Sequence, residues 1–458
     1  VPNGTHGGVR GRRLVTASYS IARTYDIMRG ARKHNMRIFV IGGGAAGLMA
    51  AIAAKETAAD ADVILIEKND KLGKKIFITG KGRGNLTNAA AIEDFFPQYV
   101  TNPRFLYSAL YDFTNQDTID LLEAHGCRTK VERGDRVFPV SDHAYSITDA
   151  LKHSIKKLGV EIRYKTEVKK IELRDGQVRG VVTDRGFQPA DAVIVATGGR
   201  SYPSTGSTGD GYRFAEEAGL KVTETYPSLV ALEVHEPDAY RLKGLSLRNI
   251  AIDIRDEDGK SYYRDFGELE FMESGLRGPV IISASAVVTK LVNASDHQKW
   301  KLLTVHIDLK PALEDAELDR RLLRDFDTHR NKELRNAFSE LLPSQLIPVF
   351  TARLAAQGVD INRKVTEVDR ETRKKIAALI RDFSFTIRGT GSFKEAIVTQ
   401  GGVSVKELNP KTMEAKKVKG LYFAGEVIDV DGYTGGFNMQ MAFSTGHLAG
   451  KAAAEALD

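Results

Sequence analysis

The sequence predicts an α/β fold in which one nucleotide-binding domain is interrupted by two inserted segments. Near the N-terminus, a short apolar strand runs through a glycine-rich turn into an apolar helix, an order typical of dinucleotide-binding domains. A second strand, glycine-rich turn and helix close the chain about 380 residues later. Between them, short alternating strands at about 221–310 give way to amphipathic helices at about 311–382, which marks the insertions.

The N-terminal turn reads Gly42-x-Gly44-x-x-Gly47, after an apolar strand at 37–41. The first glycine allows a tight turn, the second lets backbone approach a pyrophosphate, and the third lets helix and strand pack closely. The phosphates would rest on the positive end of the helix, beside Ala45 and Ala46. A glycine turn without a ligand is the weaker alternative, because strand, glycines and helix are all in register.

An acidic residue follows at the position that such a site requires. A second apolar strand, at 61–66, ends at Glu67, twenty residues after Gly47, with Lys68 beside it. A carboxylate there can accept hydrogen bonds from both ribose hydroxyls of an adenosine. We therefore place Glu67 and Lys68 among the cofactor-binding residues.

The C-terminal segments favour a flavin over a nicotinamide. Residues 420–426 read as a strand ending in Gly-Glu, and a glycine-rich stretch at 431–438 precedes an apolar helix at about 439–456. This arrangement resembles the part of a flavin site in which a second helix N-terminus meets the ribityl and flavin end. A strand at 191–195 closes in Ala-Thr-Gly-Gly, similar to the crossover strand that many flavoproteins pass under the cofactor. The three segments predict one FAD in a Rossmann-like domain of the glutathione-reductase type, contacted by Ala196, Thr197, Gly198, Gly199, Gly425, Glu426, Asp431, Gly435, Gly436, Phe437, Asn438 and Met439.

A glycine-rich basic loop at 71–88 follows the second strand. Its four glycines, with lysine, arginine, asparagine and threonine between them, suit a backbone nest with anion-pairing side chains. We expect a lid over the pyrophosphate and ring of FAD, and a solvated basic loop is the alternative. The expected contacts are Lys75, Gly82, Arg83, Gly84, Asn85, Thr87 and Asn88.

Composition limits the setting. The 458 residues are 42% hydrophobic and 28% charged, which is ordinary for a globular protein. Because no apolar run approaches the roughly 18 residues of a membrane span, we expect no membrane partner. Cys127 is the single cysteine, so no disulfide framework, Cys-x-x-Cys pair, thiolate cluster or metal site is expected within the chain, and a reducing cytoplasm is the expected location. Its place at the end of a helical pattern favours a buried structural thiol over a nucleophile.

The net charge of +6 comes from the N-terminal tail. Residues 1–35 hold seven Lys and Arg and one acid, so 59 basic and 59 acidic residues remain in the body of the chain. The tail resembles an organellar transit peptide in composition, but we favour translation from Met36. We expect 1–35 to lie outside the fold, 36–201 plus 384–458 to form the FAD-binding domain, 202–310 a β-barrel-like insertion and 311–383 a helical subdomain. Within the last, helices are predicted at 315–331, 333–342, 344–357 and 369–382.

From residue 36 onward the chain resembles the YhiN-like family of NAD(P)/FAD-dependent oxidoreductases. The matching pieces are Gly42–Gly47, the loop at 74–88, Ala196–Gly199, and the segments 204–211, 267–279 and 424–438. Residues 207–211 also resemble fumarate-reductase-type flavoproteins. The strand that contains Val168 is predicted to form a hairpin that turns at Asp175-Gly176. In flavoproteins that this chain resembles, the backbone at the position of Val168 contacts adenine.

The chain departs from the family pattern at two places. Gly84 stands where the family usually has cysteine, and Met272-Glu273 stands where it often has Thr-His. Catalytic roles proposed at those positions therefore do not transfer to this chain.

The resemblance and the motifs together imply an FAD enzyme that takes hydride from NAD(P)H and reduces an unsaturated or carbonyl substrate. Some relatives are linked to a uridine base of ribosomal RNA and others to steroid-like enones, so the partner is a small molecule or RNA. The sequence shows no second GxGxxG, so nicotinamide would bind transiently over the flavin or in the insertion. A non-catalytic flavoprotein that senses redox state is the alternative to an enzyme. Candidate proton donors are Tyr202, His143, Glu273 and Tyr433.

A basic cluster on the helical insertion bears on the RNA alternative. RNA binding needs a cationic surface, and the helical insertion is the place where basic residues gather. A solvated helix face is the more common meaning of such a cluster. Its members are Arg320, Arg321, Arg324, Arg330, Lys332 and Arg335.

Overall fold

A five-stranded parallel sheet forms the centre of the main domain. The computed structural model describes residues 36–293 and 303–456, so the predictions made for the N-terminal tail lie outside it. The strands carry near-continuous apolar runs, as expected of a parallel sheet that helices cover on both faces. Their order is β19 (Leu421–Phe423), β10 (Ala192–Val195), β1 (Arg37–Ile41), β2 (Asp62–Ile66) and β6 (Glu161–Arg163).

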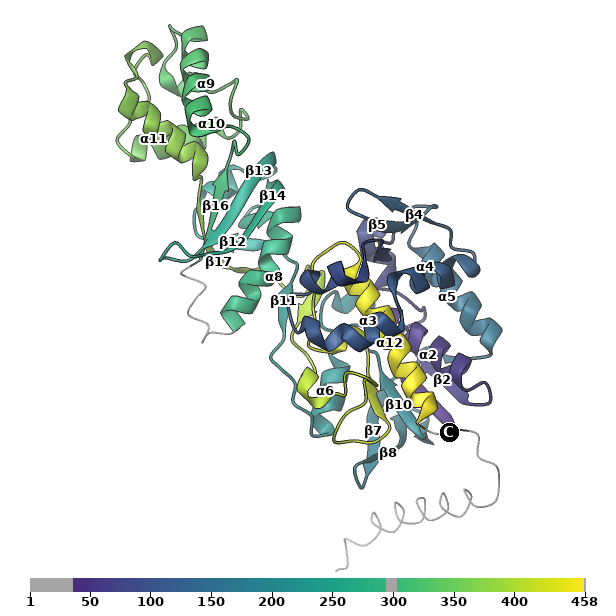
Figure 1. The fold of residues 1–458 in the computed structure, drawn as a ribbon. Coiled ribbons are helices and arrows are strands. Elements are labelled where there is room, and N and C mark those ends of the chain that lie inside the picture. The colour runs from purple at the N-terminus through teal and green to yellow at the C-terminus, as the bar shows by residue number, and fades with distance from the viewer. Residues whose placement is uncertain (1–35, 294–302, 457–458) are drawn as a thin grey trace, which may run out of the picture.

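Two helices, α2 (Ala45–Thr57) and α12 (Phe437–Glu455), pack side by side against this sheet (Figure 1). Glycines on α12 allow the close approach. A Cβ at Gly446 would come within 2.3 Å of the Ala46 carbonyl oxygen, and one at Gly450 within 2.2 Å of that of Ala50. The first and last helices of the described chain are thereby held together at the sheet.

Smaller elements surround this core. The hairpin of β7 (Val168–Arg174) and β8 (Gln177–Thr183) turns at Asp175-Gly176 as predicted, and β9 (Gly186–Pro189) extends it. Helices α3 (Tyr107–Asp112), α4 (Asn115–Ala124) and α5 (Tyr145–Leu158) lie in the same domain, as does the sheet of β3 (Thr87–Asn88), β5 (Arg136–Pro139) and β4 (Thr129–Glu132). Short 3-10 helices include η1 (Ile76–Gly82), η2 (Ile92–Gln98), η3 (Pro103–Leu106), η4 (Pro203–Thr205) and η9 (Gly425–Val427).

The predicted insertions form a closed barrel with a helical cap at the end far from the main domain (Figure 1). The barrel order is β12 (Leu232–Val234), β15 (Gly275–Arg277), β14 (Ser261–Phe271), β13 (Ser246–Arg255), β16 (Thr304–Asp308) and β17 (Phe385–Thr390). Helix α8 (Pro279–Asn293) packs on β14, and α7 (Asp238–Arg241) is a single turn. The cap contains α9 (Asp315–Thr328), α10 (Ile347–Ala356) and α11 (Arg370–Arg381).

The junctions differ from the predicted boundaries in two respects. Strand β17, which the prediction places in the main domain, closes the barrel by pairing with β12 and β16. Conversely, α6 (Asp210–Glu217), predicted to begin the insertion, contributes to the core of the main domain. The two connecting chains meet as β11 (Tyr226–Ser228) and β18 (Val398–Gln400), an antiparallel pair.

One predicted helix is much shorter than expected. The pattern at 333–342 yields only η6 (Leu334–Asn336) in the structure, whereas α9, α10 and α11 match their predicted ranges closely. Within residues 36–293 and 303–456, no helix is long and apolar enough to cross a membrane.

Candidate cofactor and active site

A large cavity opens at the carboxyl ends of the parallel strands, where ligands of α/β sheets bind. It encloses about 1280 Å³, counting the solvent at its mouth. The predicted cofactor residues that line it are Gly42, Gly44, Ala45, Ala46, Glu67, Lys68, Lys75, Val168, Ala196, Thr197, Gly198, Glu426, Asn438 and Met439.

The three glycines of the first turn do different things. Gly42 has φ +105°, a backbone conformation that side chains disfavour. A Cβ at Gly47 would lie 1.8 Å from the Gly42 carbonyl oxygen, so Gly47 permits the contact of helix and strand and does not line the cavity. A Cβ at Gly44 would meet nothing within 4 Å. Since Gly44 caps α2 and faces the cavity, its open side is where a phosphate can approach.

Glu67 lies at the end of β2 as predicted, with only 7% of its surface exposed. One carboxylate oxygen accepts a hydrogen bond from the Gly43 backbone N–H at 2.8 Å, and the other accepts from the backbone and side-chain N–H groups of Asn69. These bonds hold the carboxylate against the glycine turn, beside the place expected for the ribose.

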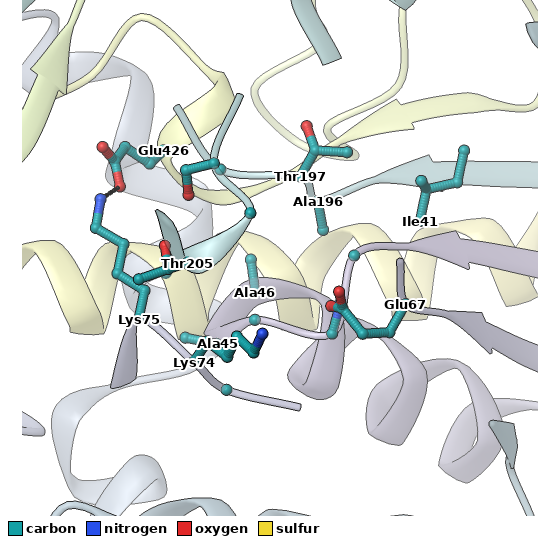
Figure 2. Close-up of a pocket in the computed structure, with 18 of the residues that line it drawn as sticks. Ile41, Ala45, Ala46, Glu67, Lys74, Lys75, Ala196, Thr197, Thr205 and Glu426 are labelled. Atoms are coloured by element: carbon teal, nitrogen blue, oxygen red, sulfur yellow. Dashed lines mark hydrogen bonds and ion pairs between the residues drawn. The ribbon is translucent and has the colours of Figure 1, made fainter. Parts of the chain in front are cut away.

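Lys75 and Glu426 both line the cavity and form an ion pair at one end of it (Figure 2). The Lys75 ammonium lies 2.5 Å from Glu426 Oε2 and donates to the Ser201 hydroxyl at 2.9 Å. The other oxygen of Glu426 accepts from the Ser201 hydroxyl and from the Thr399 backbone N–H. Gly199 makes room for this network, because a Cβ there would come within 2.4 Å of the Thr399 hydroxyl.

A second group of contacts joins the 204–210 segment to the loop after β2. The Lys68 ammonium donates to Asp210 and to the Thr208 hydroxyl, both at 2.6 Å, and the Asn69 amide donates to the Thr205 carbonyl at 3.1 Å. Lys68, Asn69, Thr205 and Asp210 all line the cavity. These contacts bring the 204–210 segment to the same side of the cavity as Glu67.

The predicted lid divides into two parts. Its first part lines the cavity through Lys74, Lys75, Ile76 and Thr79. Its second part, from Gly82 to Asn88, does not. Arg83 instead pairs with Glu132 and Asp142 and lies 4.4 Å from the centre of the Phe138 ring.

The remaining residues of this second part hold the start of α12 in place. The side-chain oxygen of Asn85 accepts from the Gly436 N–H at 2.9 Å, and its side-chain nitrogen donates to the Thr87 carbonyl at 3.0 Å. Thr87 donates to Gln440 at 2.7 Å, and Asn88 donates to the Gly435 carbonyl at 3.2 Å. Gly84 has φ +80°, and a Cβ there would lie 2.9 Å from the Ala144 Cα. Gly82, Arg83, Gly84, Asn85, Thr87 and Asn88 are therefore outside the cavity lining.

The residues predicted to contact the flavin end also divide. Glu426 lines the cavity, as do Asn438 and Met439 in the first turn of α12, whereas Gly199, Gly425, Gly435, Gly436 and Phe437 do not. Asp431 is 1% exposed and lies outside the cavity lining. Its carboxylate accepts from the Ser228 hydroxyl and the Gln400 amide, both at 3.1 Å, and burial raises its pKa to about 6.

The four candidate proton donors lie in different places. Tyr433 is half-buried beside the start of α12, and its carbonyl accepts from the Asn438 amide. Tyr202 follows Ser201 of the ion-pair network. In contrast, Glu273 is 67% exposed on the barrel and pairs with Lys243, and His143 stacks on Tyr145. None of the four lines the cavity, but Tyr433 is tied through its backbone to the lining residue Asn438, and Tyr202 adjoins Ser201 of the ion-pair network.

Several lining residues were missed by sequence reasoning. Asn69, Thr166 and Ile397 line the cavity, and Ser201 and Thr399 support its ion pair. Ser207 and Asp210 could have been found, because they fall in the 204–211 segment that carries the family resemblance. Thr399 gives no such signal, since its partner Glu426 is brought to it only by the fold.

Cys127 matches its prediction. The thiol is 1% exposed, and burial raises its pKa to about 11, which leaves it protonated and unreactive at neutral pH.

Comparisons with known proteins agree with this geometry. A family model described as the HI0933-like protein Rossmann domain matches residues 36–452. The 3-dehydro-bile acid delta(4,6)-reductase of Clostridium scindens is 32% identical over 425 residues, covering 92% of this chain and 99% of the relative. The ribosomal RNA dihydrouridine synthase of Haemophilus influenzae is 32% identical over 413 residues, covering 89% and 96%.

Among solved structures, the 3-ketosteroid delta1-dehydrogenase of Sterolibacterium denitrificans has a TM-score of 0.49 and 13% identity, covering 92% of this chain and 99% of that one. The predicted resemblance to YhiN-like proteins is confirmed by the family match. The chain belongs to the HI0933-like family of flavin-dependent oxidoreductases and has their Rossmann-type FAD-binding fold.

Proposed function

We propose that this protein is an FAD-dependent reductase that takes hydride from NAD(P)H and delivers it to a conjugated carbon–carbon double bond or a carbonyl of a small molecule. One observation carries the proposal: a single cavity joins a dinucleotide cradle at Gly42–Gly44 to the first turn of a second helix, α12. Both named relatives have names that describe hydrogen added to a ring double bond.

The residues of the cavity suit FAD at each of its parts. The open side of Gly44 and the N-terminus of α2, whose first turn carries no acidic side chain, would receive the pyrophosphate. Glu67 would accept the ribose hydroxyls of the adenosine. Asn438 and Met439 would hold the flavin end. FAD itself supplies the hydride chemistry, and the protein positions it and excludes water.

Reduction of a double bond also needs a proton. Tyr433 is the donor that we propose, because its ring centre lies 6.1 Å from that of Tyr263 on the barrel while its backbone carbonyl accepts from Asn438, a cavity-lining residue of α12. Burial and the nearby carboxylates of Asp431 and Asp265 raise its pKa, so the phenol keeps its proton at neutral pH until a strongly basic group, such as a substrate carbon left with negative charge by hydride addition, takes it. Hydride would add to one carbon of the substrate and this proton to the other.

A small molecule fits the described surface better than RNA does. The basic cluster on the helical cap is largely paired with acids: Arg321 and Arg324 with Asp325, Arg330 with Asp327, and Arg335 with Glu333. Because three acids lie against four of the six basic residues, these pairs reduce the positive charge that the cluster offers to phosphates. The buried, solitary Cys127 is compatible with the reducing cytoplasm that we propose as the setting.

An anaerobic mixing experiment tests the proposal. The FAD-loaded chain would be mixed with NADH or NADPH while flavin absorbance is followed, and then with a cyclic enone, a simple carbonyl or structured ribosomal RNA. Fast bleaching that an enone or carbonyl reverses would support the proposed reductase. Reversal only by RNA would establish the RNA alternative. Bleaching over hours with a change in oligomeric state would favour the redox sensor and contradict our proposal.

A further inference from the structure

The ion pair of Lys75 and Glu426 lies at the opposite end of the cavity from the adenosine position. Figure 2 shows Glu67 at one side, the Lys75–Glu426 pair at the other, and Ala45 and Ala46 of α2 between them. If adenosine lies at Glu67 and pyrophosphate at the start of α2, the ribityl chain and flavin ring must extend toward Lys75. This step rests on the proposed binding of FAD.

The pair is held in one position by elements that are distant in the sequence. Lys75 precedes η1, Ser201 follows β10, Thr399 lies on β18, and Glu426 lies in η9. Ser201 and Thr399 are fully buried, whereas the side chains of Lys75 and Glu426 are 25% and 15% exposed. Such a closed network fixes the direction of both charged groups and limits their freedom to reorient.

The network leaves donor capacity on the lysine. An ammonium has three N–H groups, and within the described residues two are directed at Glu426 and Ser201. Both oxygens of Glu426 already accept bonds, from Lys75, Ser201 and the Thr399 backbone. A ligand in the cavity therefore meets a cation with one N–H to donate and a carboxylate whose oxygens are largely engaged.

From this arrangement we infer that Lys75 and Glu426 set the electron affinity of the bound flavin, Lys75 by stabilising the negative charge of the reduced ring and Glu426 by opposing it. Hydride transfer from NAD(P)H would bring two electrons and one proton and would leave the bound flavin with one extra negative charge. A fixed cation at that end of the cavity favours this state. The carboxylate of Glu426 beside it partly cancels this stabilisation of the reduced flavin. The pair therefore sets how readily the flavin accepts hydride and passes it on.

Opposite substitutions should move the flavin in opposite directions. Two unit charges about 10 Å apart in a protein interior change an equilibrium by about tenfold. Lys75→Met should therefore lower the ratio of reduced to oxidised flavin at a given potential about tenfold, a shift of about 30 mV for a two-electron couple. Glu426→Gln should raise the ratio by a similar factor. The double variant should return close to the wild-type ratio.

The measurement is the midpoint potential of bound FAD, equilibrated anaerobically with a reference dye, with the FAD dissociation constant measured beside it. Lys75→Arg, which keeps the charge, should keep the wild-type potential within about threefold in the ratio. Lys71→Met, which removes an exposed lysine of the same loop, controls for the loss of net charge. Thermal unfolding of each apo variant shows whether the chain still folds.

The outcomes separate two failures. If the wild-type chain binds no FAD, the proposed function fails and this inference fails with it. If FAD binds and NAD(P)H reduces it, but Lys75→Met and Glu426→Gln leave the potential unchanged or move it in the same direction, only the inference is overturned. If both variants bind FAD more weakly and their midpoint potentials do not shift in opposite directions, the pair has only a structural role.

Discussion

Tyr433 lies where the barrel meets the main domain. Its ring neighbours Tyr263 of β14, whose hydroxyl donates to Asp265 at 2.8 Å, and its backbone is tied to Asn438 of α12. Burial raises the pKa of both tyrosines. The two phenols therefore stay protonated across the physiological range, and one of them is close to the helix that would hold the flavin.

Removing the Tyr433 hydroxyl should separate the two halves of the reaction. In Tyr433→Phe we expect NAD(P)H to reduce the flavin at the wild-type rate, while reoxidation by an enone slows by about 10²–10⁴-fold, the usual contribution of a positioned acid. Single-turnover kinetics of each half measure this. Equal slowing of both halves, or no slowing, would rule out Tyr433 as the proton donor.

Arg83 forms its ion pairs outside the cavity lining. Sequence reasoning placed it on the cofactor, but its guanidinium pairs with Glu132 and Asp142 and lies over Phe138. We expect Arg83→Gln to lower the melting temperature of the apo chain while leaving the FAD dissociation constant within about twofold. A large loss of FAD affinity at an unchanged melting temperature would show that Arg83 reaches the cofactor after all.

At the scale of elements, the β1–turn–α2 unit explains why its glycines could be interpreted from sequence. Each requirement is local: Gly42 needs a positive φ, Gly47 needs close packing against Gly42, and Gly44 needs an open side. The same locality made the β7–β8 hairpin predictable from Asp175-Gly176.

Gly44 and Gly47 give a matched pair of substitutions within this unit. Gly44→Ala adds a methyl group that meets no protein atom within 4 Å, so we expect normal folding and FAD binding weakened at least tenfold. Gly47→Ala would force apart β1 and α2, so we expect the folded apo chain itself to be lost or strongly destabilised. Apo melting temperatures and FAD titrations distinguish the two. Unchanged FAD affinity in Gly44→Ala would contradict the assigned phosphate site.

Features that join distant parts of the chain could not be predicted in this way. Strand β17 has the same alternating pattern whether it closes the barrel or returns to the main sheet, and its partner β12 lies about 150 residues earlier. Lys75 and Glu426 are 351 residues apart, and nothing local to either marks the other as its partner. The second half of the predicted lid does not line the cavity, and its sequence gives no sign of this, because a basic glycine-rich loop has the same composition whether it faces a ligand or supports a helix.

At the scale of the whole molecule, Asp431 joins the two domains. Its carboxylate accepts from Ser228 on β11 and Gln400 on β18, the two strands that connect the main domain to the barrel. Its backbone carbonyl accepts from the Val100 N–H at 2.8 Å. Burial raises its pKa to about 6, against the partial compensation of its hydrogen bonds. This junction is therefore most stable with Asp431 neutral.

The sign of the pH dependence follows from that shift. The folded-state pKa is higher than the unfolded value of about 3.9, so this group's contribution is complete below about pH 4 and is lost as pH rises through about 6. At pH 7.5 the loss is roughly 2–3 kcal/mol of unfolding free energy. Asp431→Asn should not show it, so the wild type should lose stability relative to Asp431→Asn between pH 4.5 and pH 7.5. Denaturant unfolding at several pH values measures this difference. Parallel profiles would mean that Asp431 is ionised in the folded chain throughout that range.

The identity and amount of dinucleotide held by the purified chain decide the proposal that the cavity binds FAD. We expect one FAD per chain, released intact on denaturation, with its visible absorbance present in the wild type and lost on dialysis of Gly44→Ala. A folded wild-type chain that binds no flavin, or that holds a nicotinamide dinucleotide in its place, would contradict it.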